Sequence, residues 1–118
     1  MTGDGRVLFD GEAFGRQVGG DRALGIEILH MFLEDCPVRV AAIRAAVERG
    51  DAKEIQTTAH ALKGAAGYLT AAFVVEAAAR LERIGREGRV AEAAAALEEL
   101  DAAVAQVVPE LRKAALEP

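Results

Sequence analysis

His60 is the residue of this sequence whose neighbours best suit a chemical step. It lies in the run Ala59-His60-Ala61-Leu62-Lys63-Gly64-Ala65-Ala66-Gly67, where a lysine follows it by three residues and most other side chains are small. A neutral imidazole has a nitrogen lone pair that can attack phosphorus. Phosphoryl transfer depends mainly on positioning and charge neutralisation, and Lys63 supplies one positive charge. The pattern therefore indicates a histidine that accepts a phosphoryl group.

The segment around His60 has the periodicity of an amphipathic helix. Its apolar positions are Ala52, Ile55, Ala59, Leu62, Ala66 and Leu69. At about 100° per residue, His60 lies about 130° from the centre of this stripe, so we expect it to face solvent. Lys63 lies nearer the edge of the stripe, from which its long side chain can reach His60. Gly64 and Gly67 fall on the outer side, where each costs about 1 kcal/mol relative to alanine, and we interpret them as clearance around the imidazole.

One helical segment is expected before the His60 helix, and a cap is expected where the His60 helix begins. Asp21 is a good N-cap for a helical segment that ends at Gly50. Because of Pro37, we expect either one kinked, continuous helix or two helices that meet in line near Asp35. Its apolar face comprises Leu29, Phe32, Cys36, Val40, Ile43 and Val47. Asp51, with Glu54 three residues later, begins the helix that contains His60.

Two more helices are expected after the His60 segment. Thr70 is predicted to cap the first of them, which Gly85 weakens and Gly88 ends. Its inner face is predicted to comprise Phe73, Ala77, Leu81 and Ile84. The last helix has apolar positions at Ala93, Leu97, Leu100, Val104, Val107 and Leu111 and is expected to be interrupted at Pro109.

Four long amphipathic segments with short connections predict an all-α fold, an antiparallel up-down-up-down four-helix bundle. We expect one domain over residues 1–118, in which residues 1–20 form a short N-terminal helical extension and about 21–116 form the bundle. With 52% hydrophobic residues and no tryptophan, the core must consist mainly of Ala, Leu, Val and Ile.

Composition excludes several classes of function. The net charge of −5 and the lack of a basic cluster argue against nucleic-acid binding. No apolar run reaches the roughly 18–20 residues that span a bilayer, and no signal-peptide pattern is present. Cys36 is the single cysteine, so no internal disulfide forms, as is usual in a reducing compartment. We therefore expect a cytoplasmic monomer that does not bind membranes.

The motif around His60 resembles the signature of the histidine-containing phosphotransfer (HPt) domains of bacterial phosphorelays, roughly A-H-x-L-K-G. Residues 31–37, 43–51 and 77–82 also resemble the flanking helices of that family, so the resemblance covers about residues 20–85. It implies that His60 accepts a phosphoryl group from an aspartyl phosphate on a receiver domain and passes it to an aspartate on another receiver. It also implies that Lys63 interacts with the phosphoryl group and that Gly64 keeps the approach open. Thr70 departs from the family, since many members have glycine there.

The resemblance further implies response-regulator receiver domains or a hybrid histidine kinase as partners. We expect these partners to dock on the outward side of the His60 helix, on Lys53, Gln56, Thr57, Gly67 and Tyr68, next to the motif itself. No ATP-binding domain or Gly-rich nucleotide loop is present, so we expect a phosphoryl carrier rather than an enzyme. We expect no cofactor, since the receiver supplies magnesium. Because the chain begins with Met and spans one domain, we interpret it as a free-standing protein.

Two alternatives of other classes remain open. A receiver-docking adaptor would share the fold and docking face but would not need the imidazole of His60. A metal-binding helix bundle is suggested by the Glu-x-x-His spacing of Glu27 and His30, although such sites need a second pair and two more glutamates. A reactive thiol at Cys36 is disfavoured, because this residue lies on an apolar stripe without a histidine neighbour.

Overall fold

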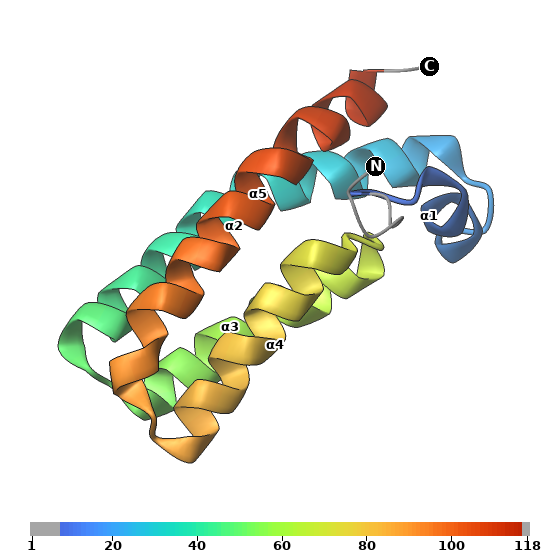
Figure 1. Cartoon of the computed structure of the whole chain (residues 1–118). Coiled ribbons are helices and arrows are strands. Elements are labelled where there is room, and N and C mark those ends of the chain that lie inside the picture. The colour runs from blue at the N-terminus through green and yellow to red at the C-terminus, as the bar shows by residue number, and fades with distance from the viewer. Residues whose placement is uncertain (1–7, 117–118) are drawn as a thin grey trace.

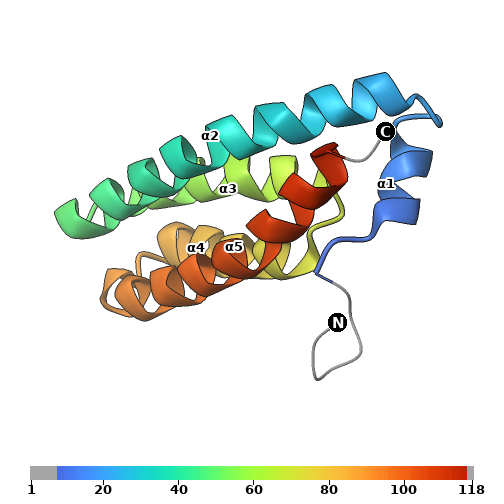
Figure 2. The ribbon, with the colours of Figure 1, turned by 90° about the horizontal axis from the view of Figure 1, so that it is seen from above.

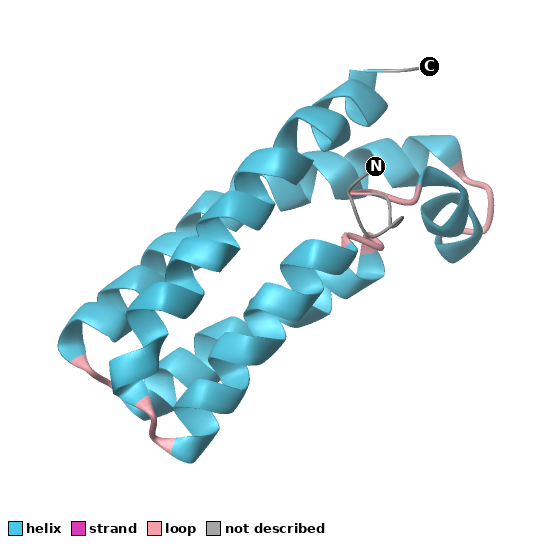
Figure 3. Cartoon of the chain, in the orientation of Figure 1, coloured by secondary structure: helices cyan, strands magenta, loops and turns pink. Residues whose placement is uncertain are grey.

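The computed structural model describes residues 8–116, and the regular structure in this range is entirely helical (Figures 1 and 3). The elements in chain order are α1 (Gly11–Gln17), α2 (Arg22–Arg49), α3 (Ala52–Tyr68), α4 (Ala72–Glu87), the 3-10 turn η1 (Val90–Glu92) and α5 (Ala93–Leu116). The predicted all-α fold with a short N-terminal helix is confirmed. The first seven residues of the expected N-terminal extension lie outside the described residues.

The four long helices form a closed ring of neighbours, in which α2 packs on α3, α3 on α4, α4 on α5, and α5 on α2. The connections are short, so consecutive helices run antiparallel in the predicted up-down-up-down order. α2 has 28 residues and α5 has 24, whereas α3 has 17 and α4 has 16. The long pair therefore extends beyond the short pair at one end, where α1 crosses (Figures 1 and 2).

Side chains and glycines define the helix ends. The carboxylates of Asp10, Asp21 and Asp51 each accept a hydrogen bond from the backbone N–H three residues on, at 3.0–3.1 Å. Gly50 and Gly88 end α2 and α4 in the left-handed conformation, with φ of 66° and 71°. The predicted caps at Asp21, Gly50, Asp51 and Gly88 are thus confirmed.

Neither internal proline ends its helix. α2 continues through Pro37 as a single helix, one of the two outcomes predicted. α5 continues through Pro109 to Leu116, so the predicted interruption is wrong. The buried residues Val107 and Leu111 flank Pro109 on the inner face. Packing on both sides of the proline outweighs the lost backbone hydrogen bond, because tertiary burial supplies most of a helix's stability.

Thr70 is not the cap of α4, which corrects the prediction. The N-cap is Ala71, which makes no side-chain cap, and Thr70 has a left-handed backbone with φ of 60°. Its hydroxyl donates to the backbone carbonyl of Asp10 at 2.8 Å. Thr70 therefore ties the α3–α4 turn to the start of α1, in a conformation that glycine would adopt without steric cost.

The core is apolar, and no polar or charged residue within residues 8–116 is buried. α4 presents Val74, Ala77, Ala78, Leu81, Ile84 and Gly85 to it. Phe73, predicted as an inner position, is only partly buried, because the contact face of α4 is centred nearer to Val74. No helix in this part of the chain is long and apolar enough to cross a membrane.

Gly85 marks the closest approach of α3 and α4. A Cβ built at Gly85 would lie 2.6 Å from the backbone oxygen of Ala52 and 2.6 Å from the backbone nitrogen of Gln56. Real Cβ atoms do not approach backbone atoms so closely. Gly85 was expected only to weaken its helix, but its lack of a side chain allows these two backbones to touch.

Replacing Gly85 by alanine should therefore destabilise the fold. Gly85→Ala forces the two backbones apart, an overpacking cost of about 1–3 kcal/mol. Gly64→Ala is the matched control, because no atom of another helix lies within 4 Å of a Cβ built there. The higher helix propensity of alanine should stabilise this variant by up to about 1 kcal/mol. Urea unfolding followed by circular dichroism measures both. Equal shifts in the two variants would contradict the close approach at Gly85.

Candidate functional site

His60 lies on the outer surface of α3, as its helical phase predicts. Its side chain is 67% exposed, while the neighbouring inner positions Ile55, Ala59 and Leu62 are fully buried. α3 is fixed against the bundle by this apolar face, so the imidazole projects from a rigid element rather than from a loop.

A single carboxylate holds both His60 and Lys63. Oε2 of Glu82 lies 2.6 Å from Nδ1 of His60, and Oε1 of the same residue lies 2.5 Å from Nζ of Lys63. Glu82 belongs to α4, whereas its two partners belong to α3. Its side chain is only 12% exposed and that of Lys63 is 33% exposed. The largely buried carboxylate of Glu82 thus orients the exposed imidazole of His60 through Nδ1.

The charge state of Glu82 determines which nitrogen of His60 is free. The hydrogen bond from Lys63 lowers the pKa of Glu82 from its ordinary value near 4.5. The hydrogen bond with His60 also lowers this pKa, whereas partial burial of the carboxylate raises it. An ionised carboxylate only accepts hydrogen bonds, so Nδ1 of His60 must carry the proton. In the neutral ring the lone pair then resides on Nε2, the nitrogen that Glu82 does not contact.

The two glycines after His60 leave its surroundings open. Apart from the adjacent residues and the backbone of α3 itself, no atom lies within 4 Å of a Cβ built at Gly64, and the nearest to one built at Gly67 is Val75 Cγ2 at 3.9 Å, an ordinary contact. Both glycines are exposed. Unlike Gly85, they are not required for helix packing, which agrees with their interpretation as clearance.

The structure divides the expected docking residues into two groups. Lys53, Gln56 and Thr57 line a hollow of about 340 Å³ together with His60 and Glu82. The Thr57 hydroxyl donates to the backbone oxygen of Lys53 at 3.0 Å, so its hydrogen is already engaged.

The other two expected docking residues lie farther along α3. Gly67 and Tyr68 are exposed near its C-terminal end and do not line the hollow beside His60. The Tyr68 ring meets that of Phe14 edge-on, with centroids 6.3 Å apart. This contact braces Tyr68 against α1.

Glu82 is the site residue that the sequence interpretation missed. It follows His60 by 22 residues, and no local spacing connects them. Gly85 offered one indication of this contact. If α4 touches α3 near Gln56, the residues before Gly85 lie opposite the residues after Gln56, because the two helices are antiparallel. Glu82, three residues before Gly85, then lies opposite the turn that contains His60. That signal is usable only once Gly85 is known to be a contact point.

The residues of the alternative interpretations lie apart from this site. Glu27 and His30 are both exposed on α2, and no group of three or more His, Cys, Asp or Glu residues suited to a metal ion occurs within residues 8–116. Cys36 is 1% exposed, and burial raises the pKa of its thiol, an effect that Arg39 partly opposes. A reactive thiol is therefore disfavoured by the structure as well.

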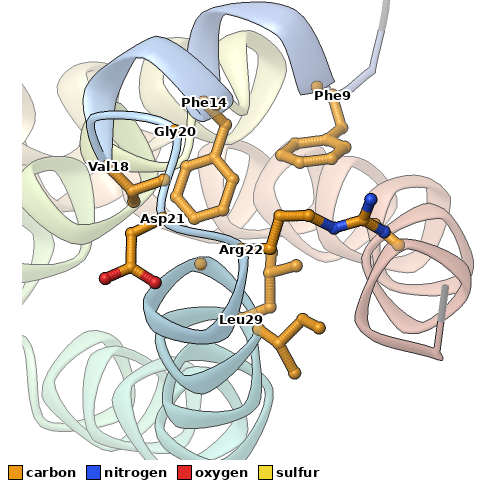
Figure 4. A pocket seen from close by; sticks show the side chains of 12 residues that line it. Phe9, Phe14, Val18, Gly20, Asp21, Arg22 and Leu29 are labelled. Carbon is orange, nitrogen blue, oxygen red and sulfur yellow. The ribbon is translucent and has the colours of Figure 1, made fainter. Parts of the chain in front are cut away.

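Another hollow, of about 350 Å³, lies at the far end of the bundle between α1, α2 and the end of α5 (Figure 4). The apolar side chains of Phe9, Phe14, Val18 and Leu29 lie along it, with Arg22 at one side. It shares no residue with the hollow beside His60, whose lining residues are all polar or charged.

Comparisons with known proteins agree with this geometry. The family model described as Hpt domain matches residues 27–110. The crystal structure of histidine-containing phosphotransfer protein B from Pseudomonas aeruginosa PAO1 is similar, with a TM-score of 0.86 and 23% sequence identity over 92% of this chain and 94% of that chain. At that identity the likeness shows the fold alone. No curated protein sequence matches the chain.

The lowered pKa of Glu82 predicts a pH-dependent contribution to stability. The interactions of the ionised Glu82 carboxylate stabilise the folded state fully at pH values above its ordinary pKa near 4.5. They are lost as the pH falls through the lower pKa that Glu82 has in the folded state. Glu82→Gln should therefore cost about 1 kcal/mol at pH 7, and this difference should shrink towards pH 3. Urea unfolding at several pH values measures it, with Glu98→Gln on the exposed face of α5 as the control. A difference that does not change with pH would contradict the ion contacts.

Proposed function

The chain belongs to the Hpt domain family, and we propose that His60 is the residue on which it carries a phosphoryl group. Members of this family are phosphotransfer proteins of phosphorelays that interact with receiver domains, and they are carriers rather than catalytic kinases. The observation that supports His60 most directly is its geometry. The ring is 67% exposed, its Nδ1 is held by Glu82, and its Nε2 is left for reaction.

We propose that the donor is an aspartyl phosphate on a receiver domain and that the acceptor is an aspartate on another receiver. Nε2 of His60 attacks phosphorus, the new P–N bond forms as the P–O bond to the donor aspartate breaks, and the electron pair leaves with the carboxylate. The imidazole ring gains a positive charge in this step, while the Nδ1 proton stays in place. Transfer to the second receiver is the same reaction in reverse.

The cations near the ring have different roles in this proposal. Lys63 shares the Glu82 carboxylate with His60, and its Nζ offers three N–H donors, so it can bond to Glu82 and still turn towards a phosphoryl oxygen. Lys53 lines the hollow with His60 and lies about two turns before it on α3. We assign Lys53 to docking, together with Gln56 and Thr57 beside the hollow and with Gly67 and Tyr68 towards the end of α3. Gly64 keeps the approach to Nε2 open.

A receiver-docking adaptor is the second candidate, because it would use the same exposed face of α3. It would not need an oriented imidazole, whereas Glu82 fixes that of His60. We further propose a cytoplasmic location, which agrees with the buried free thiol of Cys36.

His60→Gln should abolish phosphoryl acceptance. Incubation with a receiver domain that carries a labelled aspartyl phosphate should label the wild type and leave this variant unlabelled. His30→Gln, which removes the exposed histidine of α2, is the matched control and should label normally. Binding of the receiver to His60→Gln should remain. Label on His60→Gln equal to that of the wild type would contradict the assignment of His60.

Lys63→Ala and Lys53→Ala should separate the two roles proposed for the lysines. Loss of Lys63 removes a charge-assisted contact with the transferring group and should slow the transfer step by about tenfold at saturating receiver. Loss of Lys53 should weaken receiver binding and its salt dependence while leaving the saturated rate close to that of the wild type. Rapid-quench kinetics over a range of receiver concentrations measures both. Equal effects on the saturated rate would contradict the division of roles.

A further inference from the structure

Glu82 is positioned to act on the phosphorylated protein as well as on the free one. Oε2 faces Nδ1 of His60, the nitrogen that does not take the phosphoryl group in the proposed reaction. The carboxylate is 12% exposed beneath a ring that is 67% exposed. A phosphoryl group on Nε2 would therefore occupy the open side of the ring and leave the contact with Glu82 intact.

We propose that Glu82 determines how long the phosphoryl group stays on His60 and how readily it leaves. This inference rests on the proposed function of His60. Glu82 acts through the ring rather than on the phosphoryl group itself, so it is a positioning residue.

The chemistry of the leaving group gives the reason. When the P–N bond breaks, its electron pair returns to Nε2, while water or a receiver carboxylate forms the new P–O bond. If Nδ1 carries a proton, the ring leaves as neutral imidazole. If Nδ1 has lost its proton, the ring must leave as an imidazolate anion, which is a much poorer leaving group. The negative charge of Glu82 keeps the proton on Nδ1 and so favours the form that releases the phosphoryl group.

The other charged groups near the ring do not replace this effect. Lys53 and Lys63 on α3 are cations and cannot accept the Nδ1 proton. Arg86 lies one turn after Glu82 on α4 and is also a cation. Among the described residues that line the hollow, Glu82 is the one carboxylate. A phosphoryl group would attract Lys63 by its negative charge, which would leave more of the Glu82 charge to act on the ring.

Glu82→Gln tests this inference, since glutamine has the same size without the charge and its amide N–H₂ can donate to an unprotonated Nδ1. The variant should accept label from a phosphorylated receiver domain. After the receiver is removed, its phosphohistidine should decay about fivefold more slowly than that of the wild type at pH 7, because a charge-assisted hydrogen bond is roughly twice as strong as a neutral one. Its plot of decay rate against pH should shift to lower pH, and transfer to a fresh receiver should be slower.

Two further variants distinguish the effect from a general loss of structure. Glu82→Asp keeps the carboxylate and should restore part of the decay rate, whereas Glu98→Gln on the outer face of α5 should behave as the wild type. Nitrogen-15 NMR of the unphosphorylated ring should show the proton on Nδ1 in the wild type and a mixture of tautomers in Glu82→Gln. Unchanged decay and transfer in a labelled Glu82→Gln protein would overturn this inference alone. Label on residues other than His60 would overturn the proposed function instead.

Discussion

Direct contact between the backbones of α3 and α4 at Gly85 is the constraint on which the site depends. With 2.6 Å between a built Cβ and the backbone of Ala52 and Gln56, these helices can pack in this way only if position 85 has no side chain. This contact fixes how far one helix is shifted along the other. As a result, Glu82 lies opposite the turn from His60 to Lys63, and Val75 lies opposite Gly67. The site is thus a consequence of helix register.

That register lets a surface side chain be both accessible and oriented. A free histidine on a helix has several rotamers and two tautomers, whereas the covered carboxylate of Glu82 selects one arrangement and leaves Nε2 outward. Few charged groups lie near the ring. Glu82 and Lys63 hold the site together, and Lys53 is proposed to contact the receiver. In the transfer proposed for His60, much of the transition-state stabilisation comes from the receiver, and the chain releases one receiver before it meets the next.

The uneven helix lengths give the bundle two different ends. α2 and α5 extend past the α3–α4 turn, and α1 packs there, with Phe14 buried beside Gly25 of α2. The hydroxyl of Thr70 bonds to the start of α1, and the ring of Tyr68 meets Phe14. These contacts brace the C-terminal end of α3, so the helix that presents His60 is anchored at the turn as well as along its apolar face.

The sequence by itself determined the helices, most of their caps and the outward direction of His60, because periodicity and capping are local properties that three or four neighbouring residues decide. The continuity of α5 through Pro109, the left-handed Thr70 and the packing role of Gly85 depend on atoms from other helices, so local rules failed at each of them. Glu82 is the clearest case. Its effect on His60 arises only when an antiparallel neighbour is placed at one particular register, and that register is set by the fit of whole helix faces in three dimensions.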